Sequence, residues 1–398
     1  MSKPLVCLAV AGCLAAGLSS PAQAAPLYRL TDLGTLGGAF SSVTAINDAG
    51  QIVGIAQIAT GESRATLFDP SGGGANRDLG TLDGRFSSAF GINNASQIVG
   101  SASVGGPGRE TDRAVLFDSR GGAPLDLGIL GGEFLDAALD INDAGQIVGL
   151  ATTARGKLNA TLFDPTGGGA NRDLGTLGGT GFQTPSSVAN AINNAGQIVG
   201  FAETPISQIR ATLFDPSGGG ANRDLTSLDP IFFNSVATDI NEAGQIVGSA
   251  TTEDGTAIHA TLFDPSGGGA NRDLGTLGGT FFSQANAIND AEQIVGFAES
   301  GGELRESLAF LFEDELLFDL NELINPTDPL FSDVLLVAAS DINNAGQIVA
   351  NGVFVENGRL RALLLTPVAV SEPATLVLIA AGLTGLGLLA RRRPVPPP

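Results

Sequence analysis

The stretch Ile46-Asn47-Asp48-Ala49-Gly50-Gln51-Ile52-Val53-Gly54 recurs with few changes along this 398-residue chain. Its copies begin at seven isoleucines, spaced about 48 residues apart: Ile46, Ile92, Ile141, Ile192, Ile240, Ile288 and Ile342. A period of this length is typical of repeat architectures rather than of tandem independent domains.

Each repeat also carries Ala65-Thr66-Leu67-Phe68-Asp69-Pro70 and Asp32-Leu33-Gly34-Thr35-Leu36, or close variants of them. In the first repeat, short apolar segments bounded by Gly, Asn, Asp and Pro predict strands over 42–46, 51–55, 65–68 and 78–82. Gly50 is expected to supply the positive φ of a hairpin loop between the first two strands. Ser96 and Glu292 occupy this position in the second and sixth repeats, so their turns should be strained or differently shaped.

Four strands in each of seven repeats predict an all-β chain folded as a seven-bladed β-propeller. The adjacent apolar residues Ile52 and Val53 point to opposite faces of their strand, as expected for a sheet packed between two neighbours. The chain opens with the segment 32–36 and ends its repeats with 362–365, so the N-terminal strand is predicted to complete the seventh blade and close the ring. An open β-solenoid is the alternative, although its usual coils are shorter than this unit.

The repeats resemble the HAF family of extracellular repeat proteins. The Asp-Leu-Gly-Thr-Leu-Gly-Gly and Ile-Asn-x-x-Gly-Gln-Ile-Val-Gly blocks carry this resemblance over nearly all of 27–366. The His-Ala-Phe motif of the family is degenerate here and survives as His259-Ala260 and Ala309-Phe310. The resemblance implies an extracellular location and no particular activity.

Residues 1–24 have the features of a secretory signal peptide. Lys3 precedes an apolar stretch, and Ala22-Gln23-Ala24 is a small-residue cleavage site for signal peptidase, so the mature chain should begin at Ala25. The alternative is a lipobox, Val10-Ala11-Gly12-Cys13, which would make Cys13 a lipidated N-terminus. Both cysteines, Cys7 and Cys13, lie in this segment, so cleavage at Ala24 leaves no thiol for a disulfide or a metal site.

The C-terminus carries a second signal. The uncharged run 375–390 is followed by three arginines, a pattern that predicts a short transmembrane helix with its basic end in the cytoplasm. Residues 371–393 resemble the PEP-CTERM sorting signal, in which an exosortase-type enzyme processes the tail. The matching residues are Ser371, Glu372, Pro373, Arg391, Arg392 and Arg393, with Ser371 in place of the usual first Pro. A Pro-rich tail, 394–398, extends past the arginines.

The predicted organisation is therefore a signal peptide, an ectodomain over 25–370, and an anchoring tail. A net charge of −21 and a pI near 4.2 argue against nucleic-acid binding, which needs clustered Lys and Arg. Neutral glycans or surface proteins are easier partners for such a surface than anionic polymers.

Candidate chemistry is sparse between the two signals. The Gly-rich loop 69–78 recurs at 164–173, 215–224 and 264–273, but a strand follows it and it contains no Lys, so a strand connection is favoured over a phosphate cradle. Its arginines, Arg77, Arg172, Arg223 and Arg272, are expected to pair with nearby Asp side chains. His259 is the single imidazole and cannot form a multi-His metal site. No catalytic, cofactor or metal residue is predicted; a Ca²⁺ site shared between loops is the alternative.

The least repetitive segment, 313–337, contains Glu313, Glu315, Asp319 and Glu322, and a helix is expected over Glu313–Leu323. Insertions at Gly105–Arg113 and Gly181–Ser186 also interrupt the period, and such departures often mark a working face. The sequence thus predicts a secreted, envelope-anchored, non-enzymatic module that binds or builds structure at the cell surface or in an exopolysaccharide matrix. A carboxylate-dependent glycan hydrolase or lyase is the alternative, and a passive adhesin or spacer is a third hypothesis.

Overall fold

The computed structural model describes residues 26–106, 110–132, 134–179, 186–228, 234–301 and 306–368. These residues form 28 strands and no helix, so the predicted all-β class is confirmed. The strands make seven antiparallel units of four, numbered 1 to 7 here. Units 5 and 6 are joined into one sheet by a single parallel pair, Ile258 with Phe282.

The first four units follow the chain in order. Unit 1 contains β2 (Gly37–Ile46), β3 (Ile52–Ile58), β4 (Ser63–Phe68) and β5 (Arg77–Asp78); unit 2 contains β6 (Ser87–Ile92), β7 (Ile98–Val104), β8 (Thr111–Phe117) and β9 (Leu125–Asp126); unit 3 contains β10 (Ala137–Ile141), β11 (Ile147–Thr152), β12 (Leu158–Phe163) and β13 (Arg172–Gly175); unit 4 contains β14 (Ser187–Ile192), β15 (Ile198–Glu203), β16 (Ile209–Phe214) and β17 (Arg223–Asp224).

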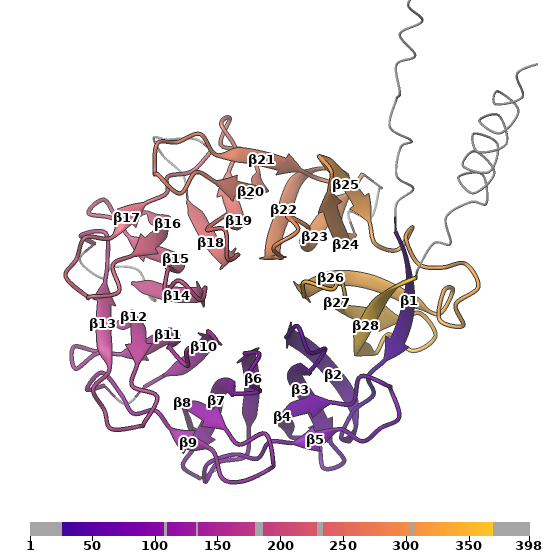
Figure 1. The fold of residues 1–398 in the computed structure, drawn as a ribbon, viewed down its shortest axis with the longest axis horizontal. Helices are drawn as coiled ribbons and strands as arrows, with labels where there is room; N and C mark the ends of the chain where they lie inside the picture. Colours follow the sequence, from indigo (N-terminus) through magenta and orange to yellow (C-terminus); the bar gives the residue numbers. More distant parts are fainter. Residues whose placement is uncertain are drawn as a thin grey trace, which may run out of the picture.

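The last three units differ in how they end. Unit 5 contains β18 (Ser235–Ile240), β19 (Ile246–Thr251), β20 (Ile258–Phe263) and β21 (Arg272–Gly275); unit 6 contains β22 (Gly278–Ile288), β23 (Ile294–Ser300), β24 (Ser307–Glu313) and β25 (Leu316–Asp319); unit 7 contains β26 (Val334–Ile342), β27 (Ile348–Phe354), β28 (Leu360–Val368) and, as its outer strand, β1 (Leu27–Asp32). The units follow one another around a central opening, with the first strand of each facing the centre (Figure 1). The arrangement is propeller-like.

The N-terminal strand pairs with the last strand of the chain. β1 lies antiparallel to β28, with Leu27 opposite Val368 and Asp32 opposite Leu363. The partner agrees with the expectation, but the strand does not: it covers Leu27–Asp32 and ends where 32–36 was expected to begin. The other edge of β1 is covered as well, because Tyr28 N donates to Leu323 O at 2.8 Å.

Each first hairpin turns at the repeated Ile-Asn motif. Asn47 N donates to Gln51 O and Gly50 N donates to Asn47 O, at 3.1 and 2.9 Å. Gly50 has a φ of 73°, as predicted. Ser96 and Glu292 keep the same shape with φ values of 62° and 63°, so these two turns are strained rather than reshaped.

Every unit has a β-bulge just before this hairpin turn in the chain. The bulge explains the last glycine of the repeated motif, Gly54 in unit 1. The pairing of β2 with β3 shifts register between Val43 and Ala45, and the other six units shift at the equivalent place. The bulged strand presses on its neighbour: a Cβ at Gly54 would lie 2.2 Å from Ser42 O. Six repeats have glycine at this position, and unit 7 has the small residue Ala350.

The core is divided among the seams between units. Ile52 packs in a cluster with Val349 and Leu364 of unit 7, whereas its neighbour Val53 packs with residues of unit 2; both side chains are fully buried. The prediction that both faces of each sheet are apolar is therefore confirmed. Each such buried side chain contributes about 1.5–3 kcal/mol.

Two local predictions are wrong. The fourth strand of unit 1 covers only Arg77–Asp78, because the Asp78 carboxylate accepts a bond from Gly80 N at 2.8 Å and the chain turns there. The helix expected over Glu313–Leu323 is absent: β24 ends at Glu313, and Asp314 and Glu315, with φ of 50° and 68°, form a tight turn into β25. Left-handed φ values at two successive residues are incompatible with a right-handed helix.

Candidate functional site

The Asn of each Ile-Asn turn links its unit to the next one. The Asn47 amide donates to Gln51 Oε1 at 2.7 Å and to Asn93 O of unit 2 at 2.9 Å, while its Oδ1 accepts from Gln51 N. The same side-chain-to-backbone bond joins each later pair of units, from Asn93, Asn142, Asn193, Asn241 and Asn289, at 2.9–3.2 Å. Asn343 Nδ2 then donates to Asn47 O at 3.1 Å, which returns the series to its start.

A second series of bonds lies one residue further along each turn. Its members are Asp48, Asn94, Asp143, Asn194, Glu242, Asp290 and Asn344, and each backbone N–H donates to the side-chain oxygen of the next member. We call these seven residues the mouth ring. All seven are exposed, so the repeated turn supplies a polar rim around the central opening.

The mouth ring encloses a cavity of about 190 Å³. The described lining residues include the carboxylates of Asp48, Asp143, Asp239, Glu242 and Asp290, and no Lys, Arg or His is among them. The mouth is therefore a region of negative potential. Such a potential attracts cations and repels anionic polymers.

Three carboxylates project inward at the β-bulge, one residue before the Ile of their repeats. Asp140, Asp239 and Asp341 belong to units 3, 5 and 7, whereas the equivalent residues are Ala45, Gly91, Ala191 and Ala287. Asp140 Oδ1 accepts from Ile141 N of its own unit and Oδ2 from Ile192 N of unit 4, both at 2.8 Å. Asp239 bridges Ile240 and Ile288 in the same way, and Asp341 bridges Ile342 and Ile46.

Burial raises the pKa of all three carboxyls. Desolvation is the largest cause in each, and the backbone N–H bonds offset it in part. The pKa of Asp239 rises to about 7, and the charge of Asp140 adds to this rise. The charges of Asp239 and Asp140 in turn raise the pKa of Asp341.

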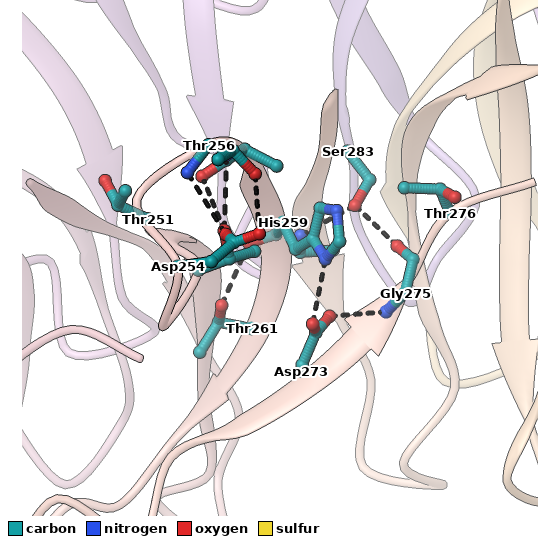
Figure 2. A network of polar contacts seen from close by, with 12 residues as sticks. Thr251, Asp254, Thr256, His259, Thr261, Asp273, Gly275, Thr276 and Ser283 are labelled. Carbon is teal, nitrogen blue, oxygen red and sulfur yellow. Dashed lines mark hydrogen bonds and ion pairs between the residues drawn. The ribbon is translucent and has the colours of Figure 1, made fainter. Parts of the chain in front are cut away.

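His259 lies in a separate cavity, of about 440 Å³, beside the hairpin between β19 and β20. Its Nδ1 is 2.8 Å from Asp273 Oδ2, and Asp273 also accepts a bond from Gly275 N (Figure 2). The hydrogen bond to Asp273 raises the pKa of His259, and burial partly opposes that rise. Asp254, in the same cavity, bonds with Thr256 rather than with the imidazole.

The His259–Asp273 pair is a variant of a contact found elsewhere in the chain. In unit 3 the equivalent Asn159 donates to both oxygens of Asp173 at 3.0 Å, and in unit 2 Arg113 lies 3.8 Å from Asp126. Three different side chains thus hold the same Asp of the repeat. This equivalence supports a structural role for His259, as the sequence predicted.

The Gly-rich loops are built by their own side chains. The Asp69 carboxylate accepts from Ser71 N and Ser71 Oγ at 3.0 and 2.7 Å, and Asn76 Nδ2 reaches Leu33 O of the preceding repeat at 2.7 Å. The expected pairing of the loop arginines with Asp is wrong. Arg77, Arg172 and Arg223 donate to backbone oxygens of the next repeat, and Arg272 pairs with Glu315.

Three acidic residues of 313–322 bond with other side chains. Glu313 accepts from Gln293 Nε2 at 2.7 Å, Glu315 pairs with Arg272, and Asp319 accepts from Asn321. In the insertion at Gly105–Arg113, Glu110 forms an ion pair with Arg85 at 2.9 Å. Each of these carboxylates has a structural partner.

Several predicted residues fall outside the described ranges. They are the cleavage residues Ala22 and Ala24, the lipobox residue Cys13, and the sorting residues Ser371, Glu372, Pro373, Arg391, Arg392 and Arg393. In the ranges that the structure describes, no cluster of His, Cys, Asp and Glu could hold a metal ion, and no helix could cross a membrane.

The sequence alone does not identify the inward carboxylates. A signal does exist: the residue before each Ile-Asn is Ala or Gly in four repeats and Asp in three, the third, fifth and seventh. That signal becomes interpretable only once the strand register places these Asp side chains beside the Ile N–H groups of two adjacent units.

Comparison with known proteins places part of the chain in context. Residues 219–362 match a family described as "Protein of unknown function (DUF3466)". No curated protein matches. Similar solved structures include a gluconolactonase from Xanthomonas campestris, with 15% identity, a TM-score of 0.38, and coverage of 86% of this chain and 95% of that one.

Two further solved structures are longer than this chain. A puromycin-hydrolyzing peptidase of Mycobacterium tuberculosis has 11% identity and a TM-score of 0.46, over 83% of this chain and 52% of its own. A Trypanosoma rangeli sialidase has 12% identity and a TM-score of 0.39, over 93% of this chain and 60% of its own. At these identities and scores the likenesses carry no argument about activity.

Proposed function

We propose that the repeats form a closed seven-bladed β-propeller that acts as a non-enzymatic binding or structural module at the cell surface or in an exopolysaccharide matrix. The observation that carries the architecture is the return of the Asn series from Asn343 to Asn47. The pairing of β1 with β28 supports it from the outer side. An open solenoid has no reason to join its first and last units twice.

The absence of a catalytic role is proposed from how the titratable side chains are used. Asp273, Asp319, Glu313 and Glu315 each bond with another side chain of the described residues. A glycosidase needs two carboxyls that face one bond of the substrate with a fixed separation. We therefore favour binding over hydrolysis.

The mouth ring is the surface proposed to contact the ligand. It presents four carboxylates and three amides around one opening, and these groups suit the hydroxyls of a neutral glycan or polar groups of a surface protein. Signal peptidase and an exosortase-type enzyme are proposed to process the two ends. The C-terminal segment 375–390 would hold the chain in the membrane before that processing.

Incubating the purified chain with neutral and anionic matrix polysaccharides tests the binding role. Saturable binding of a neutral polymer, unchanged polymer length, and several-fold weaker binding after Asp290→Ala in the mouth ring would support the proposal. Asp254→Ala, on the opposite side of unit 5, is the matched control and should bind as the parent does. Polymer shortening that disappears when one acidic residue of 313–322 is changed would establish the enzyme instead.

Localisation needs its own experiment. Cell fractionation followed by mass spectrometry of both termini should find the chain in the envelope or medium, beginning at Ala25 and lacking the arginine cluster. A soluble cytoplasmic chain that retains residues 1–24 would overturn the proposed secretion, whatever the result of the binding assay.

A further inference from the structure

Each inward carboxylate accepts hydrogen bonds from the backbone N–H groups of two neighbouring units. Each of the seven units contributes one backbone N–H from the Ile of its Ile-Asn motif. Three carboxylates accept six of them in pairs: Ile141 with Ile192, Ile240 with Ile288, and Ile342 with Ile46. Each carboxylate therefore joins its own unit to the following one, across three of the seven seams.

The seventh donor belongs to unit 2, where Gly91 stands in place of Asp. A Cβ at Gly91 would lie 3.0 Å from the Cα and 3.3 Å from Oδ1 of Asp140. Unit 2 thus packs closely against the carboxylate of unit 3. With an odd number of units, three carboxylates are the largest set that can bridge neighbours without sharing a donor.

The surroundings of the three carboxylates contain negative charge and no positive charge among the described lining residues. The charge of Asp140 acts on Asp239 and Asp341, that of Asp239 acts on Asp341, and Asp290 adds to the field at Asp239. The turns above carry Asp48, Asp143 and Glu242. The equivalent positions of the other four units hold Ala45, Gly91, Ala191 and Ala287, which add no charge. Three full charges in this place are costly, because no cation compensates them.

We propose that Asp140, Asp239 and Asp341 form one proton-responsive hub, which holds the units together more firmly after it takes up a proton than when all three carboxylates are charged. A proton removes mutual repulsion and burial cost, while the oxygens that stay unprotonated keep accepting the bridging N–H groups. The ring would be tighter in an acidic environment and looser in an alkaline one.

The sign follows from linkage. The folded pKa of Asp239, about 7, lies above the value near 3.9 of an unfolded Asp. Between these two values the folded chain binds more protons than the unfolded chain, so stability falls as the pH rises through this window. The effect belongs to the three coupled groups together rather than to one residue.

Urea unfolding of the full chain between pH 5.5 and 8.5 tests the hub through Asp239→Ala. Alanine is the natural residue at the equivalent positions of units 1, 4 and 6, so the backbone accepts it. From pH 5.5 to 8.5 the equilibrium constant for unfolding should increase in both proteins, and the factor of increase should be at least ten times larger for the parent than for the variant. Asp254→Ala is the control: the pKa of Asp254 is lowered to about 2 by bonds from Thr252 and Thr256, so this variant should follow the parent.

A direct readout covers the case in which Asp239→Ala does not fold. The infrared band of protonated carboxyl groups, recorded on the folded parent near pH 6, should be present and should weaken in Asp140→Ala or Asp341→Ala. Identical pH dependence in parent and Asp239→Ala, or no protonated carboxyl band that responds to these substitutions, would overturn the proposal.

Discussion

Asn343 donates a hydrogen bond from Nδ2 to the backbone oxygen of Asn47, 296 residues earlier in the chain. Asn193 makes the same bond to Asn241, only 48 residues later. The two contacts have the same chemistry and lengths of 3.1 Å. They differ in that the first joins the two ends of the repeat array, whereas the second joins neighbours in sequence.

This comparison predicts the effect of Asn343→Ala and Asn193→Ala. Each change removes a buried amide and leaves a Gln N–H and a backbone oxygen unpaired, which should cost about 2 kcal/mol. In a closed ring both variants lose the same amount, as measured by urea unfolding. A clearly smaller loss for Asn343→Ala would indicate that units 7 and 1 are not joined in solution.

Glu292→Gly should stabilise the chain. Glu292 holds a φ of 63° at the turn position where five repeats have glycine, and a left-handed φ costs an ordinary residue about 1–2 kcal/mol. Glycine removes this strain but gains entropy in the unfolded chain, so the expected net gain is about 0.5–1 kcal/mol.

The reverse change in an unstrained turn is its control. Gly145 has a φ of 78°, and a Cβ there would meet nothing closer than 3.6 Å, so Gly145→Ala tests backbone strain alone. It should lower the midpoint of urea unfolding, whereas Glu292→Gly should raise it. Equal midpoints for Glu292→Gly and its parent would show that the turn relaxes at little cost.

The sequence contains the repeat, and the repeat determines most of this fold. The turn at Asn47, the positive φ of Gly50 and the burial of Ile52 and Val53 in opposite seams all follow from local pattern. What could not be predicted depends on contacts between distant residues. Tyr28 N donates to the backbone oxygen of Leu323, which is far away in sequence, so the bounds of β1 cannot be predicted from short segments alone.

The same limit explains the misplaced helix and the missed carboxylates. The acidic and apolar residues of Glu313–Leu323 suit a helix. Phe318 instead pairs with Leu311 of β24, so the segment forms a strand. Asp140 follows a bulge, and the bulge arises from strand pairing rather than from any residue type. Side chains that face the channel therefore become recognisable only after the register is known.

Arg113→Ala should destabilise unit 2 strongly and in a pH-dependent manner. The Asp136 carboxylate is fully buried and lies 3.4 Å from Arg113 Nη1, and desolvation raises its pKa to about 6. Removing the arginine leaves a buried charge without its partner, at a cost of about 3 kcal/mol at pH 7.5. At pH 5 Asp136 takes up a proton, so the loss should shrink.

Arg85→Ala provides the exposed counterpart. Arg85 pairs with Glu110 at 2.9 Å with nearly half of its side chain exposed, so its loss should cost much less than the loss of Arg113, and equally little at either pH. Thermal unfolding of both variants at pH 5 and 7.5 distinguishes the two environments. An Arg113→Ala deficit that stays constant with pH would mean that Asp136 remains charged throughout.

Exchanging His259 of unit 5 and Asn159 of unit 3 should move the pH dependence of stability from one unit to the other. Its pKa is raised by Asp273, so the pair contributes stability that is fully present below pH 6.5 and is lost as the pH rises through the folded pKa. His259→Asn copies the Asn159–Asp173 contact of unit 3, in which an amide that does not titrate donates to the Asp. At pH 8.5 this variant should match the parent, and at pH 5.5 it should be less stable by about 0.5–1 kcal/mol, because Asp273 is partly exposed and screened.

Asn159→His is the reciprocal variant. An imidazole placed beside Asp173 should gain the same protonation-linked stability, so this variant should exceed the parent at pH 5.5 and equal it at pH 8.5. Melting temperatures at the two pH values suffice for the comparison. If His259→Asn and its parent show parallel profiles, His259 titrates at its ordinary pKa and the bond to Asp273 adds nothing to stability in the protonated state.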